Sequence, residues 1–221
     1  MLIERPPRLF RRLVPKGEFR IADDEGARMV YLTFDDGPIP QATPWVLDTL
    51  DRYDVKATFF MVGDNVRRYP HLAAEVFARG HRIGNHTMHH LQGAKVSCDV
   101  YMKDIAEADE YLCRAASESA AMNGTTSAAG KPLFRPPHGW LRPRQAKALY
   151  SDYRIIMYDL VTRDYSRRID ADGVVSNVKK YTRPGSIIVF HDSLKSIDKL
   201  RSALPRSLEW LRDNGFSCRI L

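Results

Sequence analysis

The stretch Val30-Tyr31-Leu32-Thr33-Phe34-Asp35-Asp36-Gly37-Pro38 decides how this chain folds. An apolar run ends in two adjacent carboxylates and then Gly-Pro, as where a buried strand delivers acidic side chains to the edge of a sheet. Two neighbouring carboxylates repel each other when both are ionised, and a bound cation or a division of roles removes that cost. An ordinary Asp-Gly-Pro turn after a strand is the alternative.

Length and composition indicate one folded domain with a basic appendage. The 221 residues are 44% hydrophobic, which is enough to bury a sizeable core without disulfide bonds or structural metal. The three cysteines, Cys98, Cys113 and Cys218, are too few and too irregularly spaced for a disulfide framework or a thiolate zinc site. We therefore divide the chain into an N-terminal arm, residues 1–27, and a single domain, residues 28–221.

The arm is rich in basic residues, and the whole chain has a formal net charge of +7; the basic residues of the arm are Arg5, Arg8, Arg11, Arg12, Lys16 and Arg20. We expect it to be solvated rather than to contact an anionic polymer or a membrane, because it lacks the dense polybasic block and apolar face of a membrane anchor. No apolar run approaches the ~18 residues of a membrane span, so we expect no transmembrane segment. The start of the chain is basic, but no apolar stretch with a cleavage site follows, so no secretory signal is visible.

Short apolar runs alternate with helical patterns along the rest of the chain. The predicted strands are Met29–Phe34, Ala57–Val62, Arg82–Gly84, Leu133–Arg135, Arg154–Val161, Ser186–His191 and Phe216–Leu221. The predicted helices are Thr43–Tyr53, Asn65–Arg79, Asp99–Ala116, Arg142–Tyr150, Asp172–Tyr181 and Ile197–Asn214. Continuous apolar runs suit parallel strands covered on both faces, so the alternation predicts an α/β fold with about seven parallel strands in a sheet or barrel. Residues 117–130, rich in Ala, Ser, Thr and Gly, are predicted as a flexible surface loop.

Histidines gather directly after the third predicted strand. His86 and His90 are four residues apart, so on a helical turn they share a face and can bind one metal ion. His89, three residues after His86, is a further candidate to face the same ion. Thr87 stands where zinc proteases with this spacing carry a catalytic Glu, so a base has to come from elsewhere, and the acidic pair can supply it. Two His and one Asp leave a coordination position for water, which is typical of a catalytic rather than a structural site.

Three further strand ends carry residues of catalytic type. Arg135-Pro136-Pro137-His138-Gly139 follows the fourth strand, Asp164-Tyr165 follows the fifth, and His191-Asp192 follows the sixth. Each alone is explained by a rigid polyproline loop or an ordinary turn. The carboxyl ends of parallel strands meet at one edge, so together these segments predict a ring of acids, histidines and an arginine around one site.

These segments, in this order, resemble the five motifs of one family: the polysaccharide deacetylases with a NodB-homology domain, carbohydrate esterase family four. The resemblance covers Tyr31 to Leu221. The matching stretches are Thr33–Pro38, His86–His90, Arg135–Gly139, Asp164–Tyr165 and Ile187–Asp192. It implies a distorted (β/α) barrel of fewer than eight strands and a metal-dependent hydrolase that removes N-acetyl groups from an amino sugar in a glycan.

The resemblance also implies roles for individual residues. Asp36, His86 and His90 would hold one divalent ion, with zinc favoured and cobalt or nickel possible. Asp35 would be the general base, Arg135 would orient it, and His191, tuned by Asp164, would be the general acid. The backbone at His138 would help to form the oxyanion hole, and Val189 would line the pocket for the acetyl methyl group. Tyr165 and Trp140 complete the expected substrate contacts.

Three departures from the family pattern concern substrate identity. His138 replaces a Tyr, Tyr165 replaces a Trp, and Val161 stands where the fourth motif often has its first Asp. The same chemistry on a non-sugar amide, a cyclic imide or an O-acetyl ester is therefore an open alternative, and a catalytically silent glycan- or metal-binding module is another. We expect an acetylated glycan as the partner, no nucleic acid, and a cytoplasmic or peripherally envelope-associated location.

Overall fold

The computed structural model describes residues 4–22, 26–123 and 130–221. Seven strands form one curled, open sheet in the spatial order β5-β4-β3-β2-β1-β7-β6, and an eighth strand, β8, pairs with the first half of β1. Every strand pairing is parallel, as the continuous apolar runs predict. The strands are β1 (Met29–Asp35), β2 (Thr58–Met61), β3 (Arg82–Asn85), β4 (Leu133–Phe134), β5 (Arg154–Ile155), β6 (Leu160–Val161), β7 (Ile187–His191) and β8 (Ser217–Arg219).

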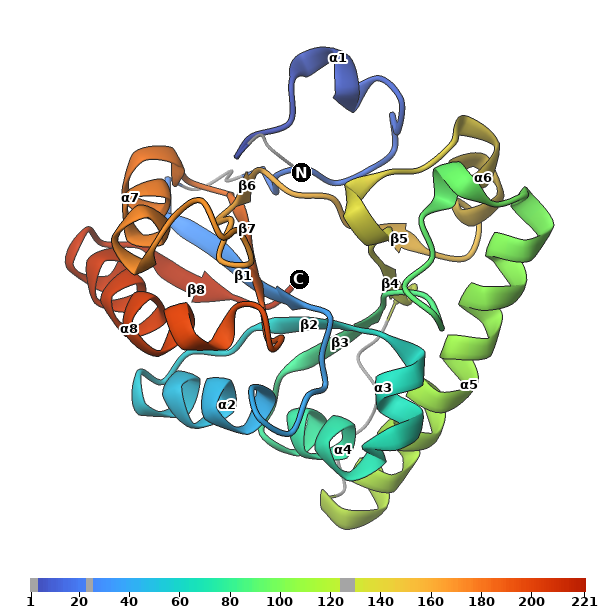
Figure 1. The fold of residues 1–221 in the computed structure, drawn as a ribbon, viewed down its shortest axis with the longest axis horizontal. Coiled ribbons are helices and arrows are strands. Elements are labelled where there is room, and N and C mark those ends of the chain that lie inside the picture. The colour runs from blue at the N-terminus through green and yellow to red at the C-terminus, as the bar shows by residue number, and fades with distance from the viewer. Residues whose placement is uncertain (1–3, 23–25, 124–129) are drawn as a thin grey trace.

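Helices surround the outside of this curled sheet, so the molecule is a distorted β/α barrel (Figure 1). The helices are α1 (Arg8–Arg11), α2 (Thr43–Arg52), α3 (Gly63–Arg68), α4 (Pro70–Ala78), α5 (Cys98–Asn123), α6 (Pro143–Leu149), α7 (Ala171–Tyr181) and α8 (Ile197–Asp213). β1 lies in the middle of the sheet, and the ring of Phe34 stacks between those of Phe59 and Phe190 at centroid distances of 5.1 and 5.7 Å. Among the described residues, no helix combines the length and apolarity that crossing a membrane requires.

Two elements predicted as continuous are each divided into two in the structure. The single strand expected at Arg154–Val161 is two short strands, β5 and β6, which lie at opposite edges of the open sheet. The single helix expected at Asn65–Arg79 is α3 and α4, which are broken at Tyr69 because Pro70 begins the second helix and disfavours helical backbone in the residue before it. α5 also runs to Asn123, through the first part of the predicted loop 117–130, and residues 124–129 of that loop lie outside the described residues.

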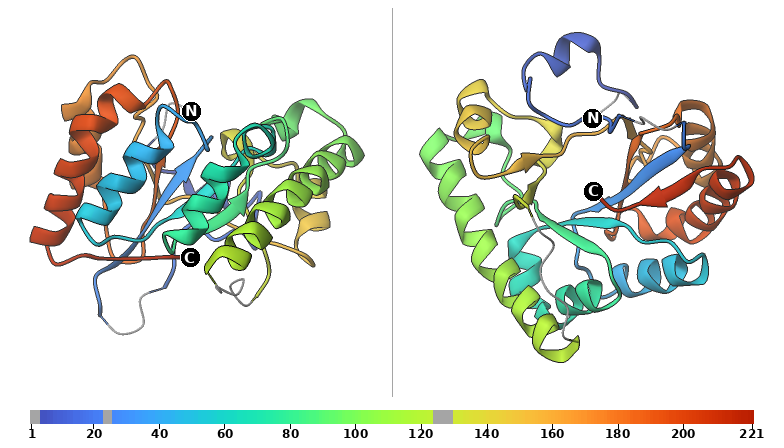
Figure 2. Two further views of the ribbon diagram at one scale, coloured as in Figure 1. Left: turned by 90° about the horizontal axis from the view of Figure 1, so that it is seen from below. Right: turned by 180° about the vertical axis from the view of Figure 1, so that it is seen from behind.

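The N-terminal arm fills the seam between the two edges of the open sheet, where Figures 1 and 2 show it spanning from β6 to β5. The backbone of Glu18 bonds to Ile155 and Met157 on one side of the seam, and the carbonyl of Glu4 accepts the N–H of Val161 on the other, each at 2.8 Å. The expectation of a solvated arm is therefore wrong for residues 4–22. The arm packs against the barrel because it buries apolar side chains there as well as pairing its backbone with the two sheet edges.

Side chains of the arm also pack into the gap between the two sheet edges, through apolar burial and through ion pairs. Val14 and Phe19 are buried, at 1% and 7% exposure, in the core beneath β4 and β5. Asp159, which is fully buried before β6, is paired with Arg5 and Arg11 of the arm at 3.1 and 3.2 Å, and also with Arg183. Two of the basic residues of the arm thus form ion pairs with a buried carboxylate of the same chain rather than remaining free for an external polyanion.

Candidate active site

The acidic pair lies at the carboxyl end of β1. Strand register places Asp35 beside His191 of β7 and beside Phe60 of β2, so the first acid and the last motif's histidine are neighbours. Asp35 is buried, at 6% exposure. Asp36 has a φ of 82°, which turns the chain away from the strand and separates the two carboxylates.

Asp192 holds this turn in place. Its carboxylate accepts the Gly37 N–H at 3.1 Å and the Thr43 hydroxyl at 2.6 Å. A Cβ on Gly37 would lie 2.0 Å from Asp192 Oδ2, so only glycine fits here. Burial raises the pKa of Asp192 to about 8, against the two hydrogen bonds that favour its ionised form. The His-Asp pair in the sequence suggests a catalytic role for both residues, but Asp192 braces the turn after Asp36.

Asp36, His86 and His90 converge into a cluster that can hold one metal ion. Their candidate ligand atoms all lie within 4.8 Å of one another, and Asp36 Oδ1 is 3.8 Å from His86 Nε2 and 3.2 Å from His90 Nε2. Ligands bound tetrahedrally at ~2.0–2.2 Å are about 3.4 Å apart, so the cluster needs little adjustment to close around an ion. Burial alone would raise the pKa of Asp36, but the imidazoles of His90, His191 and His86 hold it well below its usual range.

His86 is prepared as a neutral ligand. Its Nδ1–H donates to the Arg135 carbonyl at 2.8 Å, because a carbonyl oxygen can only accept, and this leaves the Nε2 lone pair facing Asp36. Burial is the main cause that lowers the pKa of His86 to about 4, so the ring stays unprotonated at neutral pH. A ligating imidazole has to be neutral, so both features fit a metal site.

The loop that carries these histidines is not the helical turn that we expected. Thr87 and His90 have φ values of 64° and 53°, which a right-handed helix excludes. Asp104 of α5 fixes the loop instead: its Oδ2 accepts the N–H groups of Met88 and His89 at 2.9 and 3.1 Å. His89 is turned outward, with its Nδ1 2.6 Å from Asp104 Oδ1, so it lies outside the three-residue cluster.

Arg135 joins β1 to the segment that follows β5. Its Nη1 donates to Asp35 Oδ1 and to the Thr33 hydroxyl, both at 2.7 Å. Its other donors reach the carbonyls of Ile156 and Met157 at 3.3 and 3.0 Å. Both members of the Arg135–Asp35 ion pair are buried, so the guanidinium fixes the position of this carboxylate.

His191 and Asp164 form a second buried pair. Asp164 is fully buried, and its two oxygens accept the Nδ1–H and the backbone N–H of His191 at 2.8 and 2.7 Å. Burial disfavours the imidazolium, but the carboxylates of Asp164, Asp36 and Asp35 outweigh it and raise the pKa of His191 to about 9. Lys199 of α8 supports the pair by donating to the carbonyls of Asp164 and Ser166 at 2.7 and 2.5 Å.

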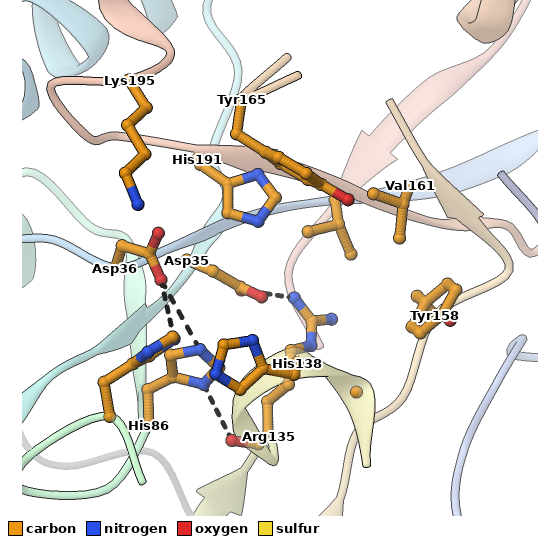
Figure 3. Close-up of a pocket in the computed structure, with 13 residues that line it drawn as sticks. Asp35, Asp36, His86, Arg135, His138, Tyr158, Val161, Tyr165, His191 and Lys195 are labelled. Atoms are coloured by element: carbon orange, nitrogen blue, oxygen red, sulfur yellow. Dashed lines mark hydrogen bonds and ion pairs between the residues drawn. The ribbon is translucent and has the colours of Figure 1, made fainter. Parts of the chain in front are cut away.

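Asp35, the metal cluster, Arg135 and His191 open into one pocket, shown in Figure 3, whereas Asp164 is fully buried and meets the pocket only through His191. The lining residues are Asp35, Asp36, His86, His90, Arg135, His138, Gly139, Tyr158, Val161, Tyr165, Val189, His191 and Lys195. Tyr158, Val161, Val189 and Tyr165 pack together as its apolar wall, and the ring of Tyr165 lies edge-on to His191 at 4.8 Å. The predicted catalytic, metal and substrate residues thus line one pocket, except for Asp164, which is held behind the pocket surface by its hydrogen bonds to His191, and Trp140.

Trp140 does not line the pocket. It is 37% exposed, and its indole packs against Phe10 of the arm at a centroid distance of 5.5 Å. His138 lies nearer the site, with its ring 4.8 Å from that of His90 and its backbone at a φ of 59°. Partial burial, then the neighbouring His90, lower the pKa of His138 below its ordinary value.

Sequence reasoning missed two of the lining residues. Tyr158 lies between β5 and β6, inside a stretch that we took for a single strand, and no motif marks it. Lys195 lies in the turn between β7 and α8, where an isolated lysine resembles any solvated loop residue. Its position after the carboxyl end of a predicted strand was the one feature of the sequence that indicated a place near the site.

The fold and the paired acid and histidine groups define a hydrolase of the β/α-barrel type, and comparison with known proteins gives its family. The family model described as polysaccharide deacetylase matches residues 22–152, and the chain belongs to this family. A peptidoglycan-N-acetylglucosamine deacetylase of Bacillus cereus is 31% identical over 94% of this chain and 93% of its own length. A chitooligosaccharide deacetylase of Rhizobium leguminosarum bv. trifolii is 31% identical over 90% and 94%.

A solved structure supports the same assignment. The Bc1960 peptidoglycan N-acetylglucosamine deacetylase, crystallised with a hydroxamate ligand, superimposes with a TM-score of 0.78 at 30% identity. The match covers 98% of this chain and 95% of that protein. The distorted-barrel architecture and the membership of the deacetylase family, expected from the five motifs, are therefore confirmed.

Proposed function

We propose that this protein is a metal-dependent hydrolase that removes N-acetyl groups from amino sugars of a glycan. One observation carries the proposal: a three-residue metal cluster, a carboxylate held by a buried arginine and an imidazole paired with a buried carboxylate open into the same pocket. Hydrolysis of an acetamide needs an activated water, a polarised carbonyl and a proton for the leaving amine, and this set provides for each need. Relatives that act on peptidoglycan and on chitooligosaccharides support a glycan substrate.

The cofactor proposed is one divalent ion held by Asp36, His86 and His90. When bound, such an ion lowers the pKa of a water molecule and polarises a carbonyl oxygen. Two imidazoles and a carboxylate suit zinc, and cobalt or nickel accept the same ligands. The neutral His86 ring and the strongly acidic Asp36 support a ligand role, because both stay unprotonated at neutral pH.

Asp35 is the proposed general base. Its carboxylate is separated from that of Asp36 by the turn at φ 82° and accepts a hydrogen bond from Arg135, so it is held in a fixed orientation while its neighbour holds the ion. A general base has to lie within hydrogen-bond reach of the water that it deprotonates, and Asp35 lines the same pocket as the metal cluster. The adjacent acids thus have different roles.

His191 is the proposed general acid. Its Nδ1 is occupied by Asp164, so Nε2 is the nitrogen left to protonate the leaving amine, and Figure 3 shows the ring facing the pocket. The backbone N–H at His138 is the proposed oxyanion donor, and a single donor of this kind is worth about 10²–10³ in rate. Val189 and Val161 form the proposed wall for the acetyl methyl group, and Tyr165 flanks His191 as a substrate contact.

A second candidate keeps the chemistry and changes the substrate to a non-sugar amide, a cyclic imide or an O-acetyl ester. The observation that favours it is the rim: His138 and Tyr165 stand where the family usually has Tyr and Trp, and Trp140 leans away from the pocket onto Phe10. A smaller aromatic rim grips an extended sugar less well. A silent binding module is the third reading, and any measurable turnover excludes it.

An acetate-release screen separates these functions. The metal-stripped protein is reloaded with zinc, cobalt or nickel and tested on N-acetylglucosamine oligomers, glycan O-acetyl esters, simple acetamides and cyclic imides. We expect acetate from the amino-sugar oligomers only, lost on chelation and in Asp35→Asn, and kept in Asp172→Asn, a carboxylate removed from the exposed surface of α7. Full acetate release without metal would overturn the proposal, and turnover confined to the other substrates would favour the second candidate.

The proposed location is the cytoplasm or the periphery of the envelope. A glycan substrate supports the envelope, and cell fractionation with an antibody against the native protein tests it. Recovery in the culture medium would contradict the proposal.

A further inference from the structure

Lys195 is a cationic residue of the pocket for which the deacetylation chemistry has no use. It is exposed in the turn between β7 and α8 and lines the pocket together with Asp36 and His191. Figure 3 shows its side chain extending to the mouth of the site, with the ammonium group on the side of Asp36 and His191. Within the described parts of the chain, no hydrogen bond or ion pair holds Lys195.

The other charged side chains next to Lys195 already have partners within the protein. Asp35 is neutralised by Arg135 at 2.7 Å, and Asp164 is paired with His191 at 2.8 Å. Lys199, four residues further along and in the first turn of α8, donates to two backbone carbonyls of the loop after β6. Lys195 therefore remains as the charge at the mouth that is available to a ligand.

The charge balance of the loaded site favours an anionic ligand. Asp36 would share its negative charge with a divalent ion, which leaves about one positive charge there, and Lys195 adds another. The whole chain, with a net charge of +7, has the same sign. A pocket of net positive charge raises the local concentration of negatively charged substrates and repels cationic ones.

The position of Lys195 indicates which part of the substrate it meets. The apolar wall of Tyr158, Val161 and Val189 is the end that suits an acetyl methyl group. In Figure 3, Lys195 lies on the other side of His191 from this wall. A sugar whose acetamide points at the wall would place its neighbouring residue in the glycan near Lys195.

We propose that Lys195 recognises a carboxylate on the sugar next to the N-acetylated one. The substrate preferred is then an acidic glycan in which amino sugars alternate with carboxylate-bearing sugars, rather than a neutral N-acetylglucosamine oligomer. This inference rests on the proposed deacetylase function and names the substrate class of the same site. Lys195 is a specificity residue and takes no part in bond cleavage.

The test compares three oligosaccharides of equal length. These are alternating N-acetylglucosamine and N-acetylmuramic acid, the same compound with its carboxylates converted to primary amides, and the chitooligosaccharide. The value of kcat/KM for acetate release is measured for the wild type and for Lys195→Gln, Lys195→Arg and Lys179→Gln. Lys179 is the matched control, since it is an exposed lysine in the last turn of α7, at the opposite end of the barrel.

We expect Lys195→Gln to lower kcat/KM about tenfold on the acidic glycan, since that is the scale of a partly exposed charged hydrogen bond. For the amide and the chitooligosaccharide, Lys195→Gln should lower kcat/KM by no more than about twofold. Lys195→Arg should keep most of the preference for the acidic glycan over the other two, and Lys179→Gln should keep all of it. Raising the salt concentration from about 0.05 to 0.5 M should narrow the wild-type preference, because the attraction is screened.

Equal losses on all three glycans, or no loss on any, would overturn the role of Lys195. Binding of the same three compounds to Asp35→Asn, with and without Lys195→Gln, tests the inference independently of turnover. The acidic glycan should bind tighter, and only while Lys195 is present; equal affinities would overturn the inference. If the acidic glycan bound more tightly but no glycan released acetate, the result would instead count against the proposed deacetylase function.

Discussion

Asp164→Asn is the most informative single change in the site. The asparagine keeps the size of the side chain but removes the negative charge that lies 2.8 Å from His191 Nδ1. The pKa of His191 is about 9, against an ordinary value of 6.5, a difference worth about 3 kcal/mol in favour of the imidazolium. Burial of His191 opposes that charge, so without Asp164 the pKa should fall to 6.5 or below.

The sign of the effect follows from the role of His191 as an acid. In the wild type the imidazolium is present below about pH 9 and is lost above it, so activity should fall on the alkaline side. In Asp164→Asn this alkaline limb should move down by about 2.5 pH units or more, and kcat/KM at pH 7.5 should fall at least about tenfold. The pair also contributes stability that is complete below pH 6.5 and disappears as the pH rises through about 9.

The assay is a pH–rate profile of acetate release from about pH 5.5 to 10 with saturating metal, for the wild type, Asp164→Asn and the surface control Asp172→Asn. A bound cation lowers the pKa of His191 in all three proteins, so the difference between the profiles is the quantity that counts. An alkaline limb that stays in place when Asp164 is changed would refute the assignment of His191 and Asp164 as a tuned acid.

Three other changes test the metal cluster, the turn and the arm. His90→Ala should leave well below one metal ion per chain by elemental analysis and cost at least about 100-fold in activity, whereas full occupancy would count against the cluster. Gly37→Ala places a Cβ 2.0 Å from Asp192 and should lower the free energy of unfolding in urea by about 2 kcal/mol or more, a loss that Asp192→Ala should partly relieve. Phe19→Ala should cost about 3–5 kcal/mol by the same measurement, whereas a solvated arm would change it by less than about 0.5 kcal/mol.

The centre of the fold was predictable because local sequence and tertiary environment agree there. The run that ends in Asp35 is continuous and apolar, and β1 is indeed covered on both faces, with Phe34 fully buried. Parallel strands end at one edge, so residues such as His86 and His191 could be assigned to a single site from their place in the order of elements. The site geometry matches this expectation even though the loop holding His86 is not helical.

The features that sequence reasoning missed depend on contacts between distant segments. The loop at His86–His90 takes its shape from Asp104, which lies on the following helix, and no local pattern records that contact. The arm looked like a solvated basic tail because its charges are visible in the sequence, while the buried partner Asp159 is not. The break at Tyr69 was readable from Pro70, and helical periodicity was given too much weight there.

In the proposed site, Asp36 and the two histidines hold a metal ion on which the base Asp35 depends, and a metal titration tests this dependence. Zinc is added stepwise to the metal-stripped wild type and to Asp35→Asn while bound metal and acetate release are measured together. The wild type should regain full activity at one ion per chain, and Asp35→Asn should bind one ion and stay inactive. Activity that is complete before any ion is added, or an Asp35→Asn protein that is fully active, would contradict the account.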